Sequence, residues 1–110
     1  MSQYYKIIYS LQAADDLKDI YYYIAFELSV PDTAKNQVNR IRKSIRSLDF
    51  MPARFPIVDW EPWQSMNMHK VSVDKFVVFY LVDSDKLCVT IIRIVYSGRD
   101  IEAIAQTDGI

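Results

Sequence analysis

The sequence predicts an α+β fold: an N-terminal strand, an α-helical hairpin and then a three-stranded antiparallel meander, with the helices packed on one face of the sheet. Two observations support this fold. Residues 75–102 hold two runs of β-branched and aromatic residues around a short polar turn at 83–85, which is the pattern of an antiparallel hairpin. Before that hairpin, apolar residues recur at helical spacing in two segments that Pro31 separates. The chain, residues 1–110, has the length of a single domain with one core.

The first three elements follow from residue type and spacing. Residues 4–9 are mainly β-branched and aromatic and predict a strand, and Ser10 can cap the helix that follows. Pro31 favours a break, and a second apolar seam begins after it. Because the linker is short, we expect the two helices to run antiparallel. The apolar positions are Leu17, Ile20, Ile24 and Leu28 in the first helix and Ala34, Val38, Ile41, Ile45 and Leu48 in the second.

The segment from 50 to 64 is predicted to be irregular, because it contains three prolines. It also contains Trp60 and Trp63, so it is too apolar to extend freely into solvent. We expect it to lie across the sheet edge or the open end of the core, either as a packed lid or with one tryptophan exposed to a partner. Stacking of a nucleic-acid base is the alternative use of such a ring.

The remaining strands come from the last part of the chain. Residues 66–73 alternate, with His69 on the same face as two valines, and the strands of the hairpin follow a turn at Asp74. We expect an antiparallel sheet whose face away from the helices stays more open. Ser97 and Gly98 form a flexible corner after the last strand, and residues 99–106 form a final helical turn or stay extended.

Charge narrows the class of protein. The formal net charge is −1, so a globally basic surface for nucleic acid is not expected. Five basic residues nevertheless stand in the second helical segment with no acid among them, and they form either a solvated face or a surface for a partner. They are Lys35, Arg40, Arg42, Lys43 and Arg46.

Composition also bears on cofactors and location. A single cysteine, Cys88, excludes an internal disulfide and a thiolate metal cage, and only two glycines leave no glycine-rich phosphate loop. We therefore expect no metal and no cofactor. No apolar run is long enough to span a membrane, and the N-terminus has no secretory signal pattern. These features predict a cytoplasmic protein without a membrane partner.

Polar residues gather at the end of the last buried strand, where Arg93, Tyr96 and Arg99 follow one another. Cleavage of RNA by its own 2′-hydroxyl needs no metal, but it needs a base, cations at the phosphate and a proton donor for the leaving oxygen. His69 or Lys70 is the candidate base, Arg93 and Arg99 are candidate phosphate ligands, and Tyr96 is a candidate proton donor or stacking platform. These five are the candidate catalytic residues of an RNA-cleaving enzyme.

The same residues also have structural interpretations. Strict alternation places Arg93 on an apolar strand face, so it can pair with Asp100 or Glu102. His69 can be a buried histidine with a satisfied hydrogen bond. Arg99 and Asp100 can form a surface ion pair of little energetic value.

Two segments resemble a known family. Residues 76–80, Phe-Val-Val-Phe-Tyr, and residues 91–101, Ile-Ile-Arg-Ile-Val-Tyr-Ser-Gly-Arg-Asp-Ile, resemble the end of bacterial toxins of the RelE/ParE superfamily of type II toxin–antitoxin systems. The resemblance covers nearly the whole chain, because the order of its helices and strands also agrees. It implies a cytoplasmic toxin that inhibits growth and is held inactive by a cognate antitoxin, in a toxin–antitoxin hetero-oligomer.

The resemblance implies two targets. Ribosome-dependent members cut messenger RNA; they carry an arginine or lysine in the strand where this chain has Val77 and Val78, and often a His-Tyr pair where it has Tyr96 and Ser97. The uninterrupted apolar strand and the Tyr-Ser-Gly-Arg-Asp corner are more similar to the ParE branch, whose members bind DNA gyrase. We therefore expect a gyrase-binding toxin, with a ribosome-dependent messenger RNA endonuclease as the alternative.

Overall fold

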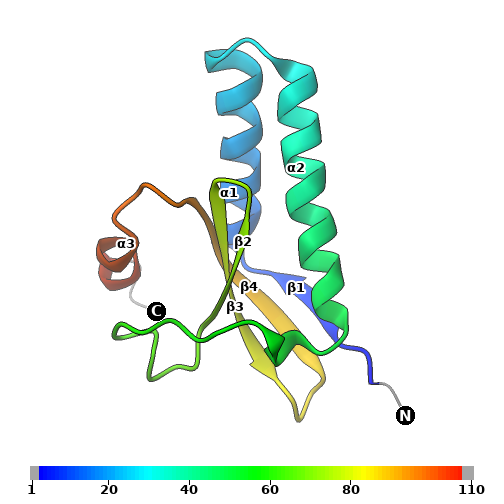
Figure 1. Cartoon of the computed structure of the whole chain (residues 1–110), viewed down its shortest axis with the longest axis vertical. Helices are drawn as coiled ribbons and strands as arrows, with labels where there is room; N and C mark the ends of the chain where they lie inside the picture. The colour runs from blue at the N-terminus through cyan, green and yellow to red at the C-terminus, as the bar shows by residue number, and fades with distance from the viewer. Residues whose placement is uncertain (1–2, 108–110) are drawn as a thin grey trace.

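The computed structural model describes residues 3–107 of the chain. Its order of elements is that of the predicted α+β fold. Figure 1 shows the two long helices side by side, extending beyond a small sheet, with the third helix on the other side of that sheet. The elements are β1 (Lys6–Tyr9), α1 (Leu11–Tyr22), the π-helical turn η1 (Tyr23–Glu27), α2 (Pro31–Arg46), the 3-10 turns η2 (Ser47–Asp49) and η3 (Pro52–Arg54), β2 (His69–Val73), β3 (Phe76–Asp83), β4 (Cys88–Tyr96) and α3 (Ile101–Thr107).

The sheet has the strand order β1-β4-β3-β2. The predicted meander is confirmed, because β2 pairs antiparallel with β3 and β3 pairs antiparallel with β4. The expectation that every pair of strands is antiparallel is wrong: β1 lies parallel to β4, with Lys6 opposite Cys88 and Tyr9 opposite Ile91. A strand of four residues carries no pattern that fixes its direction, so the packing of the helical hairpin decided it.

The first core lies between the sheet and the helical hairpin, as the helical spacing predicted. Ser10 caps α1 through a hydrogen bond that its Oγ accepts from the Ala13 N–H at 3.0 Å. The prediction fails at the end of the first helix, where Leu28 is 53% exposed, because the hairpin extends past the sheet. The buried residues of this core are Ala13, Leu17, Ile41, Ile45, Leu48, Val71, Val78, Tyr80, Val89, Ile91 and Ile94.

A second core covers the opposite face of the sheet, so the expectation of an open face is wrong. The irregular segment and α3 provide the cover. Trp63 is fully buried, with its ring centroid 4.9 Å from that of Phe79 and 5.2 Å from that of Trp60, which is partly buried. The reason lies in β3 and β4, which carry apolar residues on both faces and need two covers. This core comprises Val58, Trp63, Met68, Val77, Phe79, Ile92, Val95 and Ala105.

The free end of the helical hairpin has an unusual surface. The chain leaves α1 through the π-helical turn, in which the Leu28 N–H donates to the Tyr23 carbonyl at 3.1 Å. Several large apolar side chains stay exposed there, because no part of the sheet reaches them. They are Tyr22, Tyr23, Phe26, Leu28 and Val30. Among residues 3–107, no helix is both long enough and apolar enough to cross a lipid bilayer.

Candidate functional site

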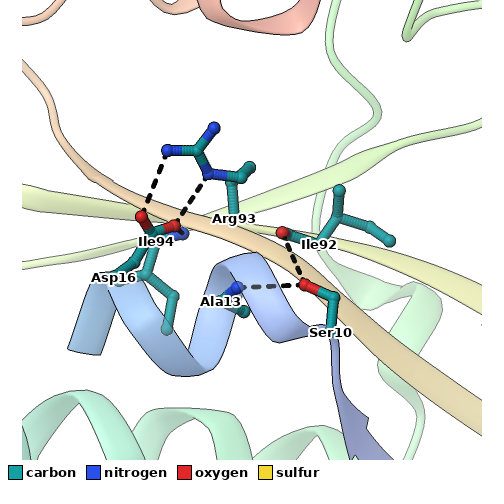
Figure 2. Close-up of polar contacts among 6 residues, drawn as sticks. All are labelled: Ser10, Ala13, Asp16, Ile92, Arg93 and Ile94. Atoms are coloured by element: carbon teal, nitrogen blue, oxygen red, sulfur yellow. Dashed lines mark hydrogen bonds and ion pairs between the residues drawn. The ribbon is translucent and has the colours of Figure 1, made fainter. Parts of the chain in front are cut away.

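The backbone N–H and C=O groups on the outer edge of β4 find their hydrogen-bond partners in two different ways along the strand. β1 pairs with its first half and ends at Tyr9, opposite Ile91. Beyond that point, side chains of the α1 segment take over, as Figure 2 shows. The Ser10 hydroxyl donates to the Ile92 carbonyl at 2.9 Å, and the Asp16 carboxylate accepts the Ile94 N–H at 2.9 Å. Side-chain groups therefore replace the missing partner strand and fix α1 against the sheet.

Arg93 binds the same carboxylate. Its Nε lies 2.8 Å and its Nη2 3.1 Å from the two oxygens of Asp16, and the two side chains are only 12% and 11% exposed (Figure 2). Such a paired geometry is the strong form of an arginine–carboxylate contact. A phosphate would have to compete with Asp16 for this guanidinium.

The prediction paired Arg93 with Asp100 or Glu102 and did not include Asp16. Strict alternation failed because the register shifts between Phe79 and Tyr80, so the bulge in β4 moves Arg93 off the expected face. Asp100 instead accepts the Ala103 N–H at 3.1 Å, at the start of α3. The side chain of Glu102 lies outside the described part of the structure.

A groove of about 890 Å³ lies beside this contact, between the helical hairpin and the ends of β3 and β4. We call it the sheet-end groove. Its lining is mostly apolar, and charged groups of both signs stand among the apolar ones. The apolar and aromatic part comprises Ile20, Tyr23, Ile24, Leu28, Val30, Phe76, Ile94, Val95 and Tyr96, and the charged part comprises Asp16, Asp19, Arg40, Asp74, Lys75 and Arg99.

Tyr96 and Arg99 are the predicted site residues that open onto this groove. The Tyr96 side chain is 48% exposed, and its ring packs edge-on against Phe76 at a centroid distance of 6.1 Å. A Cβ at Gly98 would approach Tyr96 Cε2 to 2.5 Å, so only glycine lets the ring fold over the corner. The Arg99 N–H donates to the Tyr96 carbonyl at 3.1 Å, which keeps the exposed Arg99 next to the ring.

At the opposite wall of the groove, sequence reasoning named Arg40 only as part of a basic run and missed its contacts with Asp74 and Gln37. Asp74, in the turn before β3, accepts hydrogen bonds from Arg40 Nε at 2.7 Å and from Gln37 Nε2 at 3.0 Å. The hydrogen bond from Arg40, followed by that from Gln37, holds the pKa of Asp74 below its ordinary value. This contact ties α2 to the β2–β3 turn. The available signal was an aspartate in a tight turn, where Asp74 has a φ of 55°.

His69 and Lys70 lie away from the sheet-end groove. His69 is 8% exposed, its Nδ1–H donates to the Phe55 carbonyl at 2.7 Å, and its ring stacks on Tyr80 at 5.2 Å. Burial raises the pKa of Tyr80 to about 12, so this phenol stays neutral at ordinary pH. Lys70 is paired with Phe79 in the sheet, and neighbouring strand residues point to opposite faces, so it does not share a face with His69.

Strand register shows how far apart the candidates are. Tyr80, the partner of His69, stands opposite Ile91, which is five residues from Tyr96 along β4. At ~3.3 Å per residue this is roughly 16 Å along the sheet. The structure therefore brings Arg93, Tyr96 and Arg99 to one end of the molecule and leaves His69 and Lys70 outside that group. Among residues 3–107, no three His, Cys, Asp or Glu side chains gather where they could hold a metal ion.

Similarity to known proteins agrees with the fold. A sequence model of the family described as "ParE toxin of type II toxin-antitoxin system, parDE" matches residues 7–101. A solved chain of a chromosomal ParDE system from P. aeruginosa is 20% identical, with a TM-score of 0.65 over 84% of this chain and 95% of that one. No curated protein matches the chain by sequence.

Two further structures are similar at lower identity. A chain of the toxin–antitoxin complex RelBE2 from Mycobacterium tuberculosis is 15% identical, with a TM-score of 0.61 over 86% of this chain and 92% of that one. A chain of the archaeal RelE–RelB complex from Pyrococcus horikoshii is 16% identical, with a TM-score of 0.52 over 88% and 99% of the two chains. At these identities the likeness establishes the shared fold.

Proposed function

The chain belongs to the ParE toxin family of type II toxin–antitoxin systems, and we propose that it inhibits growth by binding DNA gyrase and that a cognate antitoxin neutralises it. The observation that carries the proposal is the family match, which spans residues 7–101 and so runs from the second residue of β1 to the first residue of α3. The gyrase target is the finer part of the proposal, and the geometry of the site supports it.

The sheet-end groove is suited to binding a macromolecule. It is wide and largely apolar, and the exposed side chains of Tyr23, Leu28 and Val30 lie on its lining. A continuous exposed apolar surface of this kind marks an interaction site in a protein of this size. Tyr96 and Arg99 add an exposed ring and an exposed cation, the residue types enriched at the energetic centres of interfaces.

The residues needed for RNA cleavage are less well placed. His69 is buried and already donates to a carbonyl, and the guanidinium of Arg93 is bound to Asp16. A general base must come within hydrogen-bonding distance of the proton that it removes, and His69 lies far along the sheet from Tyr96. This arrangement favours a toxin that acts by binding, with messenger RNA cleavage on the ribosome as the alternative.

The target is tested by adding the purified toxin to two reactions: supercoiling of a relaxed plasmid by gyrase, and translation of a defined messenger RNA in an extract. We expect inhibition of supercoiling and an intact messenger RNA. The variant Tyr96→Ala with Arg99→Ala should inhibit supercoiling at least about tenfold less well, because it removes two exposed contacts. The control Tyr4→Ala with Lys86→Ala removes an exposed ring and a cation away from the groove and should match the natural protein.

Shortened messenger RNA together with unimpaired supercoiling would overturn the gyrase target in favour of the nuclease. Loss of that cleavage in the Tyr96 and Arg99 variant would then assign both residues to the nuclease site. Arg93→Ala is a poor probe of either mechanism, because it leaves the largely buried carboxylate of Asp16 without its guanidinium and perturbs the fold.

We further propose that the antitoxin covers the sheet-end groove and so hides it from the target. The candidate partner is the product of the reading frame next to the toxin gene. Co-expression should restore growth, and Leu28→Asp should weaken the complex about tenfold or more, because it places a charge in an apolar contact. Leu11→Asp is a matched control, since Leu11 is 84% exposed and lies outside the groove. Equal effects of the two aspartates would exclude the groove as the antitoxin site.

A further inference from the structure

A second groove, of about 540 Å³, lies between the two helices of the hairpin, next to the end of β1. It shares no lining residue with the sheet-end groove. Its floor is apolar and formed by Leu17 and Val38. Its walls carry three tyrosines and three cations, and we call it the basic tyrosine groove. These wall residues are Tyr9 at the end of β1, Lys18, Tyr21 and Tyr22 on α1, and Arg42 and Arg46 on α2.

Helical spacing brings the wall residues together. Tyr21 and Tyr22 follow Lys18 by three and four residues on α1, so both rings lie next to Lys18 on one side of the helix. Arg42 and Arg46 are four residues apart on α2, with their Cβ atoms about 6 Å from each other. The two helices run side by side (Figure 1), and side chains of both line the groove: the rings of Tyr21 and Tyr22 from α1 and the guanidinium groups of Arg42 and Arg46 from α2.

The cations of this groove are not neutralised by acids. Neither of the ion pairs that the structure describes, Arg93 with Asp16 and Arg40 with Asp74, involves Lys18, Arg42 or Arg46. No aspartate or glutamate lines the groove. Burial raises the pKa of the Tyr9 phenol, and the positive charges of Arg42 and Arg46 lower it in part, so both guanidinium groups act at the end of the groove where Tyr9 lies.

The tyrosine rings are held in place. Tyr22 is 50% exposed and stacks on Phe26 at a centroid distance of 5.5 Å, and Tyr21 packs edge-on against Tyr22 at 5.8 Å. Aromatic rings that are already fixed lose little conformational entropy when a ligand stacks on them. The groove therefore combines pre-positioned rings with free positive charge.

We propose that the basic tyrosine groove binds single-stranded nucleic acid. A groove that binds single strands without sequence preference needs cations that follow the phosphates and aromatic faces on which bases stack. The six wall residues supply both. Arginine suits the first task, because its planar fork matches phosphate oxygens and it remains charged. An acidic polypeptide would use the cations but would leave the tyrosine rings without a role.

The net charge of −1 does not oppose this binding. Exposed charges act over a distance of about 10 Å at ~0.1 M salt, so the local balance decides. Asp16 and Asp19 line the sheet-end groove, and neither lines the basic tyrosine groove. The proposed site is independent of the gyrase target, because it is measured on the toxin alone, and the failure of one proposal leaves the other intact.

The experiment measures the fluorescence anisotropy of labelled DNA and RNA single strands of roughly ten nucleotides, a length within the usual site sizes. The natural toxin is titrated into each strand at a series of salt concentrations. Three phosphate contacts predict that the logarithm of the association constant falls with the logarithm of the salt concentration with a slope of about −2. We expect binding of both strands with this slope.

Three variants separate the contributions. Arg42→Gln with Arg46→Gln should weaken binding at least about tenfold and reduce the slope to about −0.7. Tyr22→Leu should weaken binding about tenfold and leave the slope unchanged, because it removes a stacking surface and no charge. Lys35→Gln with Lys43→Gln is the matched control: it removes two exposed charges from the same helix outside the groove and should change affinity less than about twofold.

Absence of binding to both strands would overturn the proposal, and so would equal losses in the Arg42 and Arg46 variant and its lysine control. A polyglutamate competitor supplies the last test. Displacement of the oligonucleotide by polyglutamate at equal charge, together with no effect of Tyr22→Leu, would overturn the nucleic-acid assignment and identify a surface for acidic polypeptides.

Discussion

The two grooves differ in how their arginines are held. At the sheet-end groove, the wall residue Arg40 is bound to Asp74, and the neighbouring Arg93 is bound to the groove residue Asp16. The exposed Arg99, which also lines this groove, is the exception, because neither described ion pair involves it. In the basic tyrosine groove, Arg42 and Arg46 take part in neither described ion pair, and no aspartate or glutamate lines the groove beside them. Three of these arginines lie on α2 within two turns of one another. Residue type and position in the helix therefore do not decide whether an arginine supports the fold or remains available to a ligand; the partner that the fold brings to it does.

The two arginines that are bound to carboxylates differ in how far they are buried. The Arg93–Asp16 pair is 12% and 11% exposed, whereas the Arg40–Asp74 pair is 53% and 44% exposed. A pair removed from water is strongly coupled to the fold, while solvent screens an exposed one. The comparison thus orders the charged residues by their expected effect on stability.

The largest loss of stability is expected for Asp16→Ala. The substitution removes the carboxylate that binds the largely buried Arg93 and also removes the acceptor of the Ile94 N–H. Breaking such a contact costs about 3–5 kcal/mol of the free energy of unfolding. Urea denaturation followed by circular dichroism measures this loss directly.

The neighbouring substitution Asp15→Ala is the control for that experiment. Asp15 is exposed and stands on the same helix, so its removal should change the free energy of unfolding by less than about 0.5 kcal/mol. Equal losses for the two variants would contradict the structural role of Asp16 at the edge of β4.

A small, pH-dependent effect is expected for Asp74→Asn. Asparagine also tolerates the φ of 55° at this turn, so the substitution removes the charge and little else. Because hydrogen bonds from Arg40 and then Gln37 lower the folded-state pKa of Asp74, its carboxylate stabilises the fold above the ordinary value of 3.8. That contribution is lost as the pH falls through the folded-state pKa.

Urea denaturation of the natural protein and of the Asp74→Asn variant at a series of pH values tests whether the carboxylate stabilises the fold at neutral pH and stops doing so in acid. The natural protein should be slightly more stable than the Asp74→Asn variant at neutral pH, and the two curves should converge in acid. A difference that stays undiminished once the pH is well below the lowered folded-state pKa would assign the effect to packing of the side chain and not to its charge.

The smallest effect on stability is expected for Arg42→Gln with Arg46→Gln. Neither guanidinium has an ion pair in the described structure, and both side chains are exposed. The free energy of unfolding should therefore change by less than about 0.5 kcal/mol, as is usual for surface substitutions. A clearly larger loss would show that these arginines support the fold and would remove the contrast between the two grooves.

Much of the fold could be predicted from local pattern. The hairpin of β3 and β4 and the two long helices follow from residue type, breakers and apolar spacing, and Ser10 caps α1 as predicted. The sequence of β3 also indicated a second core, because its residues are apolar on both faces of the strand and each face needs a cover. The cover of this second core was predicted only in part: a packed lid was one of the two expectations for the segment with Trp63, but that segment has no periodicity, and only packing against Phe79 fixes which face it covers.

The candidate site could be predicted in part. Tyr96 and Arg99 line the sheet-end groove, since they follow β4 directly and the corner at Gly98 keeps them together. The Asp16 partner of Arg93 was missed because a bulge interrupts the alternation of β4. His69 was grouped with Arg93, Tyr96 and Arg99 because all of them come from the last strands of the chain. The strand register, however, places His69 far along the sheet from Tyr96.

The sequence by itself determined the order and kind of the elements, because the positions of turns, caps and apolar residues are properties of short segments. It also pointed to the end of β4 and to a basic stretch on α2. Only the tertiary structure decided the parallel direction of β1, the cover over the second face, and which arginines are bound to carboxylates. The physical reason is that these are pairings between segments far apart in the chain, selected by how all of the layers pack at once.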